Sequence, residues 1–138
     1  MLLTLQSAVE DIRDSDAKEI SKIAALAAHG SLMGARGNSG VILSQIFRGF
    51  AKHVQGKSEL TPAELADALE EAANAAYRAV IKPTEGTILT VAREAGKAAK
   101  AAAADPNAHV NTVIQAACKA AKAATDKTPT QLAILREA

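Results

Sequence analysis

The sequence predicts an all-α fold, either an antiparallel bundle or a closed barrel of about seven amphipathic helices. Alanine makes up about a quarter of the 138 residues and aromatic residues only 2%. This composition is typical of closely packed helices, because alanine is small and is the best helix former. Apolar residues recur at three- and four-residue spacing, and no segment shows the alternation of a strand. The length suits one domain over residues 1–138.

Two helices are predicted before a glycine-rich stretch. The first covers residues 1–13 and carries its apolar side chains on one face. We expect the acidic run at 14–16 to break it, and Ser15 or Asp16 to cap the second helix. That helix runs to Gly34, which we expect to close it in the left-handed conformation.

The stretch His29–Gly40 holds four of the eight glycines and separates two helical patterns. Asn38 or Ser39 can cap the next helix, which runs to about Val54. The first turn of a helix presents unpaired N–H groups at the positive end of its dipole, and glycines let a ligand approach the backbone. The stretch is therefore either an ordinary interhelical turn or a phosphate site. A P-loop and a Rossmann turn are excluded, because no strand precedes it.

The next two helices also begin beside proline or glycine. Thr61-Pro62-Ala63-Glu64 is a capping box with proline at the first helical position, and Pro83 is expected to stop the helix that it opens. A second glycine loop covers residues 82–87. It leads into a helix from Ile88, with Thr87 as the cap.

The last two predicted helices begin at Asp105-Pro106 and at Thr128. The first reaches about Ala124. Thr128-Pro129-Thr130-Gln131 has the pattern of a second capping box, and the helix that it opens would continue to Ala138. If the helices alternate in direction, the starts at Ser39, Thr87 and Thr128 can gather at one end. Such an end would suit a polyphosphate, each terminus adding roughly 0.3–1 kcal/mol.

The composition limits which partners the protein can bind and in which cellular compartment it is expected. A net charge of +1 argues against electrostatic capture of nucleic acid. No apolar run approaches the length of a membrane span, and the N-terminus turns acidic within ten residues, unlike a signal peptide; we expect a cytoplasmic protein. The single Cys118 falls in step with apolar neighbours and is expected in the core. Asp11, Asp14 and Asp16 fit a solvated helix junction better than a metal site.

Three motifs resemble a known family. The run His-Gly-Ser-Leu-Met-Gly-Ala-Arg-Gly-Asn-Ser-Gly-Val-Ile-Leu-Ser-Gln at 29–45 is similar to the nucleotide-binding L domain of dihydroxyacetone (glycerone) kinases. It resembles most closely the N-terminal domain of the fatty acid kinase A subunit. Lys-Pro-Thr-Glu-Gly-Thr-Ile-Leu-Thr-Val at 82–91 and Thr-Pro-Thr-Gln-Leu at 128–132 resemble the second and third motifs, in the same order. The resemblance covers essentially the whole chain.

The resemblance implies a helical barrel that binds ATP or ADP at one end. Ser39 would contact the phosphates through its hydroxyl, with Asn38 and Gly40 beside it. Leu43 would lie on the adenine side, and the second and third motifs would flank the nucleotide. Arg36 could meet a phosphate or a carboxylate of its own fold. The full set of nucleotide-binding residues implied is Asn38, Ser39, Gly40, Leu43, Gly86, Thr87, Ile88, Thr128, Pro129 and Leu132.

The sequence departs from the family at both ends. These kinases hold two Mg²⁺ ions with an aspartate-rich motif before the first core helix, and Met1 resembles the last residue of that motif. The Mg²⁺ ligands are therefore expected to be absent, as is an Asp-Ala-Gly segment beyond Ala138. Because phosphoryl transfer depends on metal-neutralised charge, we expect little or no catalysis by this chain alone and a weakened affinity for the nucleotide. The pattern is typical of a truncated domain or of a mis-started reading frame.

The sequence is compatible with two functions. The first is the ATP-binding domain of a phosphotransferase whose acceptor, an acyl carboxylate or else dihydroxyacetone, lies on a separate protein or domain. The second is a non-catalytic helical module that regulates or binds a partner protein. An apolar seam left by a missing flanking helix could also drive homodimer formation.

Overall fold

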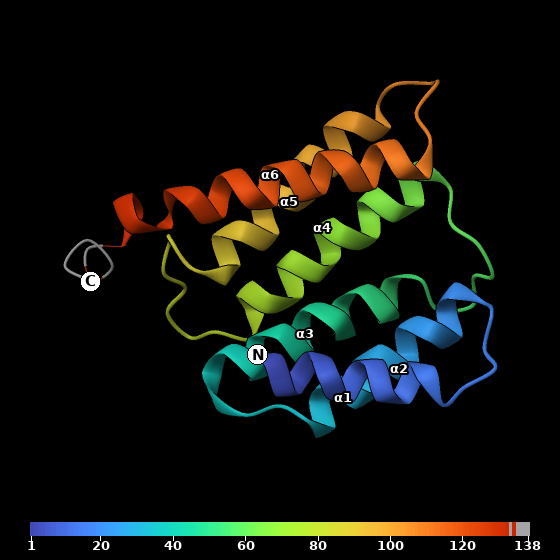
Figure 1. Cartoon of the computed structure of the whole chain (residues 1–138). Helices are drawn as coiled ribbons and strands as arrows, with labels where there is room; N and C mark the ends of the chain where they lie inside the picture. Colours follow the sequence, from blue (N-terminus) through green and yellow to red (C-terminus); the bar gives the residue numbers. More distant parts are fainter. Residues whose placement is uncertain (133, 135–138) are drawn as a thin grey trace.

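The computed structural model describes residues 1–132 and 134, and these residues form six helices and no strand. Successive helices run in opposite directions (Figure 1). The all-α prediction is confirmed, with six helices in place of about seven. The helices are α1 Leu2–Arg13, α2 Ile20–Met33, α3 Gly37–His53, α4 Pro62–Arg78, α5 Ile88–Ala103 and α6 Val110–Gln131.

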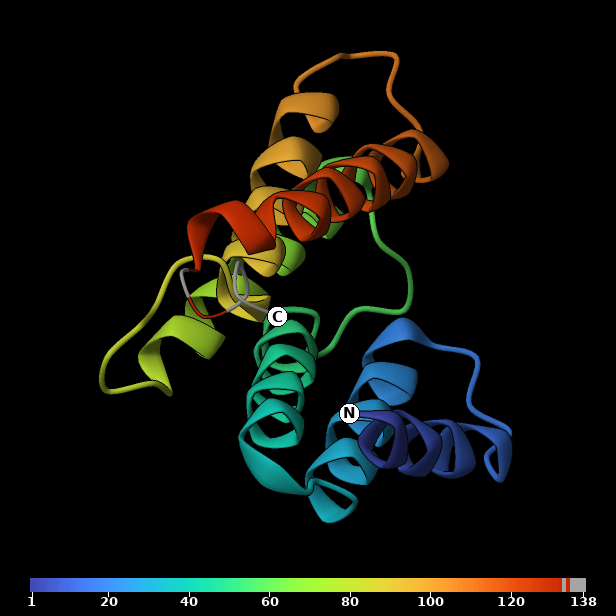
Figure 2. The same cartoon turned by 60° about the vertical axis from the view of Figure 1, so that its left-hand side comes forward.

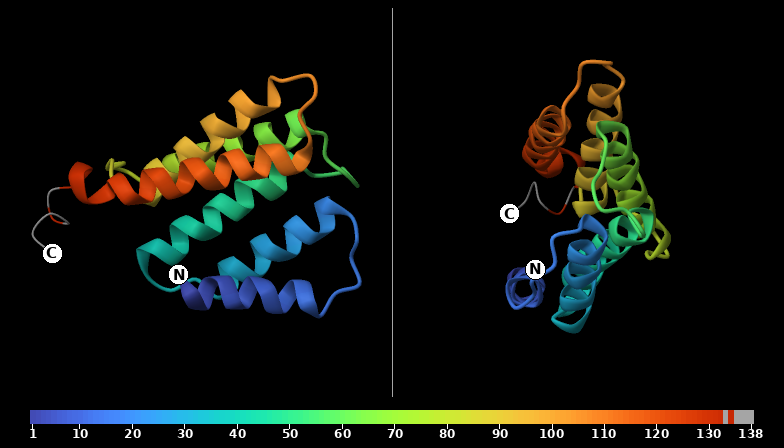
Figure 3. Two further views of the ribbon diagram at one scale, coloured as in Figure 1. Left: turned by 45° about the horizontal axis from the view of Figure 1, so that its top comes forward. Right: turned by 90° about the vertical axis from the view of Figure 1, so that its right-hand side faces the viewer.

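Each helix packs mainly against the helices next to it in the sequence. Figures 2 and 3 show α1 to α3 on one side of the molecule and α4 to α6 on the other, joined where α3 meets α4. Within the described residues α1 makes no contact with α6. Of the two predicted architectures, the structure therefore has the antiparallel bundle, and the bundle is open along one side.

Small side chains dominate the core and bring the helices close together. Around α4, α5 and α6 the buried cluster consists of Leu65, Ala66, Ala99, Val113 and Ala117. At the contact between α3 and α4, a Cβ built on Gly49 would lie 2.6 Å from the Cβ of Ala75. The helices therefore approach at a distance that only a glycine and an alanine permit.

The predicted seventh helix is instead the end of α6. Pro129 lies inside α6, where it cannot donate the backbone hydrogen bond of a helix to the carbonyl of Thr125. The hydroxyl of Thr128 donates to that carbonyl instead, at 2.8 Å. The helix continues, with the N–H of Leu132 donating to the carbonyl of Thr128 at 3.0 Å. The predicted extension to Ala138 falls partly on residues 133 and 135–138, outside the described residues.

Three predicted helix ends are also wrong. The Ser15 hydroxyl accepts from the N–H of Ala17 in a turn, and α2 begins only at Ile20, whose N–H donates to the carbonyl of Ser58. Gly34 has a right-handed φ of −90°. In the last connection, Asp105 accepts from the N–H of Asn107, and α6 begins after this turn.

The predicted cap of α3, Asn38 or Ser39, is also wrong, because α3 begins at Gly37 with Arg36 at the cap position and no side-chain cap. Two other predicted caps are present. Thr61 and Glu64 form the reciprocal capping box of α4, and the Thr87 hydroxyl accepts from the N–H of Leu89 at the start of α5. Cys118, in contrast, is exposed. It lies on α6 beside the buried Ala117, one position outside the packed face. None of the described helices is long and apolar enough to cross a membrane.

Candidate functional site

The three motif segments meet at one end of the bundle, on the left in Figure 1. The start of α3 and the connection between α4 and α5 line one cleft, which contains both Asn38 and Lys82. The same connection reaches the end of α6, since a Cβ on Gly86 would lie 3.0 Å from the N of Leu132. The starts of α3 and α5 share this end with the C-terminal end of α6. The expected third helix start, at Thr128, does not exist.

The cleft has a volume of about 580 Å³, within the range of small-molecule sites. Its walls are largely apolar, with one amide and one ammonium group. Ile81 is 97% exposed and adds apolar surface to the cleft. The lining residues are Asn38, Val41, Ile42, Ala79, Val80, Ile81 and Lys82.

The start of α3 has free hydrogen-bond donors. Arg36 occupies the cap position without a side-chain cap, and the first turn carries no acidic residue. Gly37 opens the helix with a φ of +68°, and the next two residues, Asn38 and Ser39, are exposed. The first N–H groups of a helix have no partner within the helix. This turn therefore offers donors and a positive dipole end to an anion.

Gly40 plays a packing role that the sequence did not reveal. It is buried, and a Cβ there would lie 2.6 Å from Oγ1 of Thr4 on α1. Thr4 is fully buried, and its hydroxyl makes no hydrogen bond to any described residue. Because Gly40 has no side chain, α1 can pack directly against the start of α3.

A polar network fixes the second glycine loop to α5. Arg93 donates to both carboxylate oxygens of Glu85, at 2.6 and 2.9 Å. The Tyr77 hydroxyl donates to Glu85 at 3.2 Å, and that of Thr90 at 2.6 Å. The same Thr90 hydroxyl accepts from the N–H of Gly86 at 2.9 Å. Hydrogen bonds, first that from Arg93, lower the pKa of Glu85 to about 2, so the carboxylate stays ionised at neutral pH.

The remaining residues of the second loop hold its geometry. Gly86 has a φ of +79° and lies against the end of α6, where Leu132 is half-buried. The Thr87 hydroxyl, besides capping α5, donates to the carbonyl of Thr84 at 2.8 Å. Ile88 is half-buried. These contacts fix the conformation of the second loop and its position against α6.

The other predicted residues lie near this end with different roles. Leu43 is half-buried one turn along α3 and is not part of the cleft lining. Thr128 is half-buried, and Pro129 is exposed on α6. Arg36 donates to the carbonyls of Ala35, at 2.8 Å, and Met33, at 3.4 Å. Within the described residues it therefore pairs with no carboxylate, and it satisfies carbonyls at the end of α2. A contact of Arg36 with a phosphate stays a prediction.

Three residues of this end were missed at the sequence level. The sequence pattern places Lys82 only at the edge of the loop, yet it lines the same cleft as Asn38. Glu85 and Arg93 form the ion pair that orients the loop. A signal was present, since Arg93 lies eight residues after Glu85 in a helix that follows the loop directly. Among residues 1–132 and 134, no group of three or more His, Cys, Asp or Glu is placed to hold a metal.

Comparison with known proteins adds a family match over the same segments. A family model described as the DAK2 domain matches residues 1–138. Protein YloV of Bacillus subtilis is 42% identical over 137 residues, which cover 99% of this chain and 25% of that protein. Uncharacterized proteins of Staphylococcus epidermidis and Staphylococcus haemolyticus match with the same identity and coverage. The chain thus spans about a quarter of the length of these curated relatives.

Proposed function

This chain belongs to the DAK2 domain family, and from that premise we propose that it binds ATP or ADP in the cleft between the start of α3 and the connection from α4 to α5. The phosphates would lie at the first turn of α3, against the N–H groups of Asn38, Ser39 and Gly40. Lys82 would supply a cation from the opposite wall. The uncapped, acid-free start of α3 is the observation that carries the proposal.

The chemistry of the cleft fits a nucleotide. Val41, Ile42 and Val80 offer apolar surface to a base and a sugar, while donors and one ammonium group lie where an anion would bind. Glu85, the acidic residue closest in sequence to Lys82, is neutralised by Arg93. We therefore expect little repulsion of the phosphates from the second loop. Leu132, beside Gly86, would border the base as the family motif implies.

We propose nucleotide binding, and not catalysis, for this chain by itself. The described residues form no carboxylate cluster for Mg²⁺, so we derive no phosphoryl-transfer step from them. In a longer protein of the family the nucleotide would donate a phosphoryl group to an acceptor held by another domain or protein. An acyl carboxylate is the first choice of acceptor and dihydroxyacetone the second. Both remain proposals about the longer proteins.

Isothermal titration with ADP, with and without Mg²⁺, tests the binding site. Ser39→Asp is the sharpest variant, because a carboxylate in the first turn favours the helix but repels a phosphate. We expect it to weaken ADP binding by roughly tenfold or more. Ser39→Ala removes only the hydroxyl and should weaken binding less, and Lys82→Ala should also weaken it.

The matched controls change the same residue types elsewhere. Ser58→Asp lies in the exposed connection before α4, and Lys119→Ala lies on an exposed position of α6. Neither should alter the affinity. A wild-type protein that fails to bind ADP, or equal losses in Ser39→Asp and Ser58→Asp, would contradict the proposed site.

A role as an interaction module has its own supporting observation. On α1 the apolar residues Leu2, Leu3, Leu5 and Val9 are 68, 61, 41 and 47% exposed. Apolar residues gathered on one helix favour burial against another surface. We propose that these residues of α1 are buried in a homodimer interface or against a partner domain. Light scattering over a wide concentration range tests the homodimer, which a constant monomer mass would exclude.

A further inference from the structure

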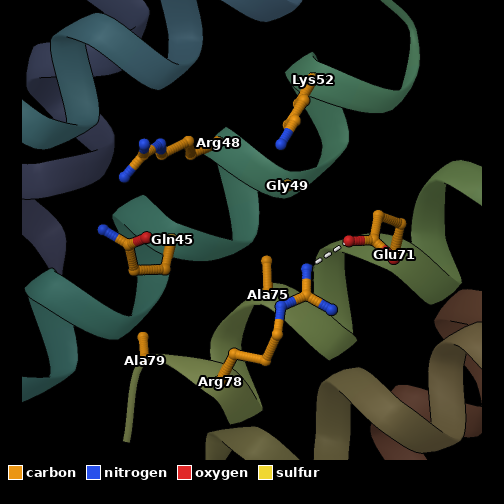
Figure 4. Close-up of a pocket in the computed structure, with 8 residues that line it drawn as sticks. All are labelled: Gln45, Arg48, Gly49, Lys52, Glu71, Ala75, Arg78 and Ala79. Atoms are coloured by element: carbon orange, nitrogen blue, oxygen red, sulfur yellow. Dashed lines mark hydrogen bonds and ion pairs between the residues drawn. The ribbon is translucent and has the colours of Figure 1, made fainter.

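A second hollow lies between α3 and α4, further along α3 than the nucleotide cleft, with which it shares Ala79 as a lining residue. It has a volume of about 270 Å³. Its floor is formed where Gly49 and Ala75 bring the two helices together. Figure 4 shows the side chains around it, from both helices. The lining residues are Gln45, Arg48, Gly49, Lys52, Glu71, Ala75, Arg78 and Ala79.

The rim of this hollow carries an excess of positive charge. Arg48 and Lys52 follow one turn apart on α3, and neither makes a hydrogen bond or ion pair with a described residue. Arg78 is paired with Glu71, and hydrogen bonding from Arg78 is the main cause that lowers the pKa of Glu71. The three cations and the carboxylate of Glu71 together give the rim of the hollow a net charge of +2. Arg48 and Lys52, two cations without a counter-charge on neighbouring turns of α3, favour an anionic partner.

Arg48 and Lys52 lie along α3 and Arg78 lies on α4, so the three cations do not surround one point. In Figure 4 Arg78 lies on α4 beside Glu71 and Lys52 points along α3 toward Gly49, whereas Arg48 and Gln45 extend to the side of α3 away from α4. There Arg48 and Gln45 also line a neighbouring hollow with His29 of α2. The hollow at α3 and α4 is also smaller than the usual small-molecule site. This layout suits an extended ligand better than a single small anion.

Among extended anions, the layout favours a polypeptide over a nucleic acid. The hollow contains no aromatic side chain on which a base could stack. Two unpaired cations are few for a phosphate backbone, whose binding needs many neutralised charges. Carboxylates one helical turn apart would match the spacing of Arg48 and Lys52, because both repeat at about 6 Å.

We propose that the surface formed by Arg48 and Lys52 of α3 and Arg78 of α4 docks an acidic polypeptide segment with carboxylates at helical spacing. Its side chains would pair with Arg48 and Lys52, and one would enter the hollow above Gly49. The proposal is independent of nucleotide binding, since none of the three cations lines the nucleotide cleft.

Fluorescence anisotropy at low ionic strength tests this docking surface. The probe is a labelled alanine-based helical peptide with glutamates at i and i+4, and its counterpart has glutamine at those positions. We expect saturable binding of the glutamate peptide only, weakened by added salt. Arg48→Ala combined with Lys52→Ala should weaken it by roughly three- to thirtyfold, since each exposed pair contributes modestly.

The matched control removes two exposed lysines of α6, Lys119→Ala with Lys127→Ala, and lowers the net charge equally. It should leave peptide affinity within about twofold, as expected for screened, distant charges. Equal losses in both double variants, or no binding of the glutamate peptide, would overturn the proposal. So would an oligothymidylate that competes as well as the peptide. ADP affinity should be unchanged in Arg48→Ala, Lys52→Ala, which separates this site from the nucleotide cleft.

Discussion

At the scale of single residues, the ion pair between Glu85 and Arg93 controls the second glycine loop. The Glu85 carboxylate accepts hydrogen bonds from Arg93, Tyr77 and Thr90. Its side chain is 50% exposed, so solvent screening limits what the pair contributes. The network therefore acts chiefly on loop geometry, by fixing where the N–H of Gly86 and the start of α5 lie.

Glu85→Gln is expected to lower the free energy of unfolding by roughly 0.5–1 kcal/mol at neutral pH. Folding depresses the pKa of Glu85 from 4.5 to about 2. A depressed pKa stabilises the fold above the unfolded value, and this contribution is lost as the pH falls toward 2. Urea unfolding of both proteins between pH 7 and 3 should show their difference shrinking below about pH 4.5. Glu59→Gln, at an exposed position, is the control; a difference that stays constant with pH would refute this account.

Gly86→Ala should cost more stability than Gly56→Ala. Both glycines have a φ near +80°, so both substitutions carry the strain of a left-handed residue, about 1 kcal/mol. A Cβ at Gly56 meets open space, whereas one at Gly86 would lie 3.0 Å from Gln131 Cβ and from the backbone of Leu132. We expect an additional loss of about 1 kcal/mol or more at Gly86 from overpacking. Equal unfolding free energies of the two variants would show that the loop does not pack on α6.

At the scale of helices, the contact between α3 and α4 depends on a missing side chain. Gly49 is inside α3, where alanine would be favoured by about 1 kcal/mol on helix propensity alone. A Cβ there would, however, lie 2.6 Å from Ala75 Cβ and 3.0 Å from the carbonyl oxygen of Glu71. The packing cost outweighs the gain in helix propensity, because the atoms close to the added Cβ include backbone atoms that cannot easily move. The net effect on stability is therefore unfavourable.

Gly49→Ala is therefore expected to destabilise the protein by roughly 1–2 kcal/mol, although it favours the helix. Adding Ala75→Gly should recover part of the loss, since it removes the closest atom. A double-mutant cycle from urea unfolding measures this coupling. A stabilising Gly49→Ala, or additive effects of the two changes, would mean that α3 and α4 lie further apart.

The helix ends show what could be predicted from the sequence and what could not. Thr61-Pro62 and Thr128-Pro129 look alike locally, yet the first opens α4 and the second lies inside α6. The difference is tertiary: Gly86 packs against Gln131 and Leu132 and supports the last turn of α6. The first N–H groups of α2 likewise find carbonyls in residues 57–58, which no local pattern reveals.

At the scale of the whole molecule, alternation of the helices places the motif segments together. The sequence predicted the all-α class and offered alternation of the helices as one arrangement. In the structure this arrangement brings Asn38 of the first motif to the same cleft as Lys82 of the second. It did not predict that Arg93 pairs with Glu85, or that Thr4 of α1 packs against Gly40 of α3. The first depends on how the second loop folds back on α5 and the second on which faces of α1 and α3 meet, and the spacing of apolar residues leaves both open.

The central claim is that the phosphates of a nucleotide bind at the start of α3. Backbone amide NMR during titration with ADP tests it most directly, because every non-proline N–H reports its own surroundings. We expect the largest saturable shifts at Gly37 to Gly40, with smaller ones at Lys82 and Gly86 to Ile88. Shifts confined to the α3 face of Arg48 and Lys52, or an absence of saturable shifts at Gly37 to Gly40, would contradict the account.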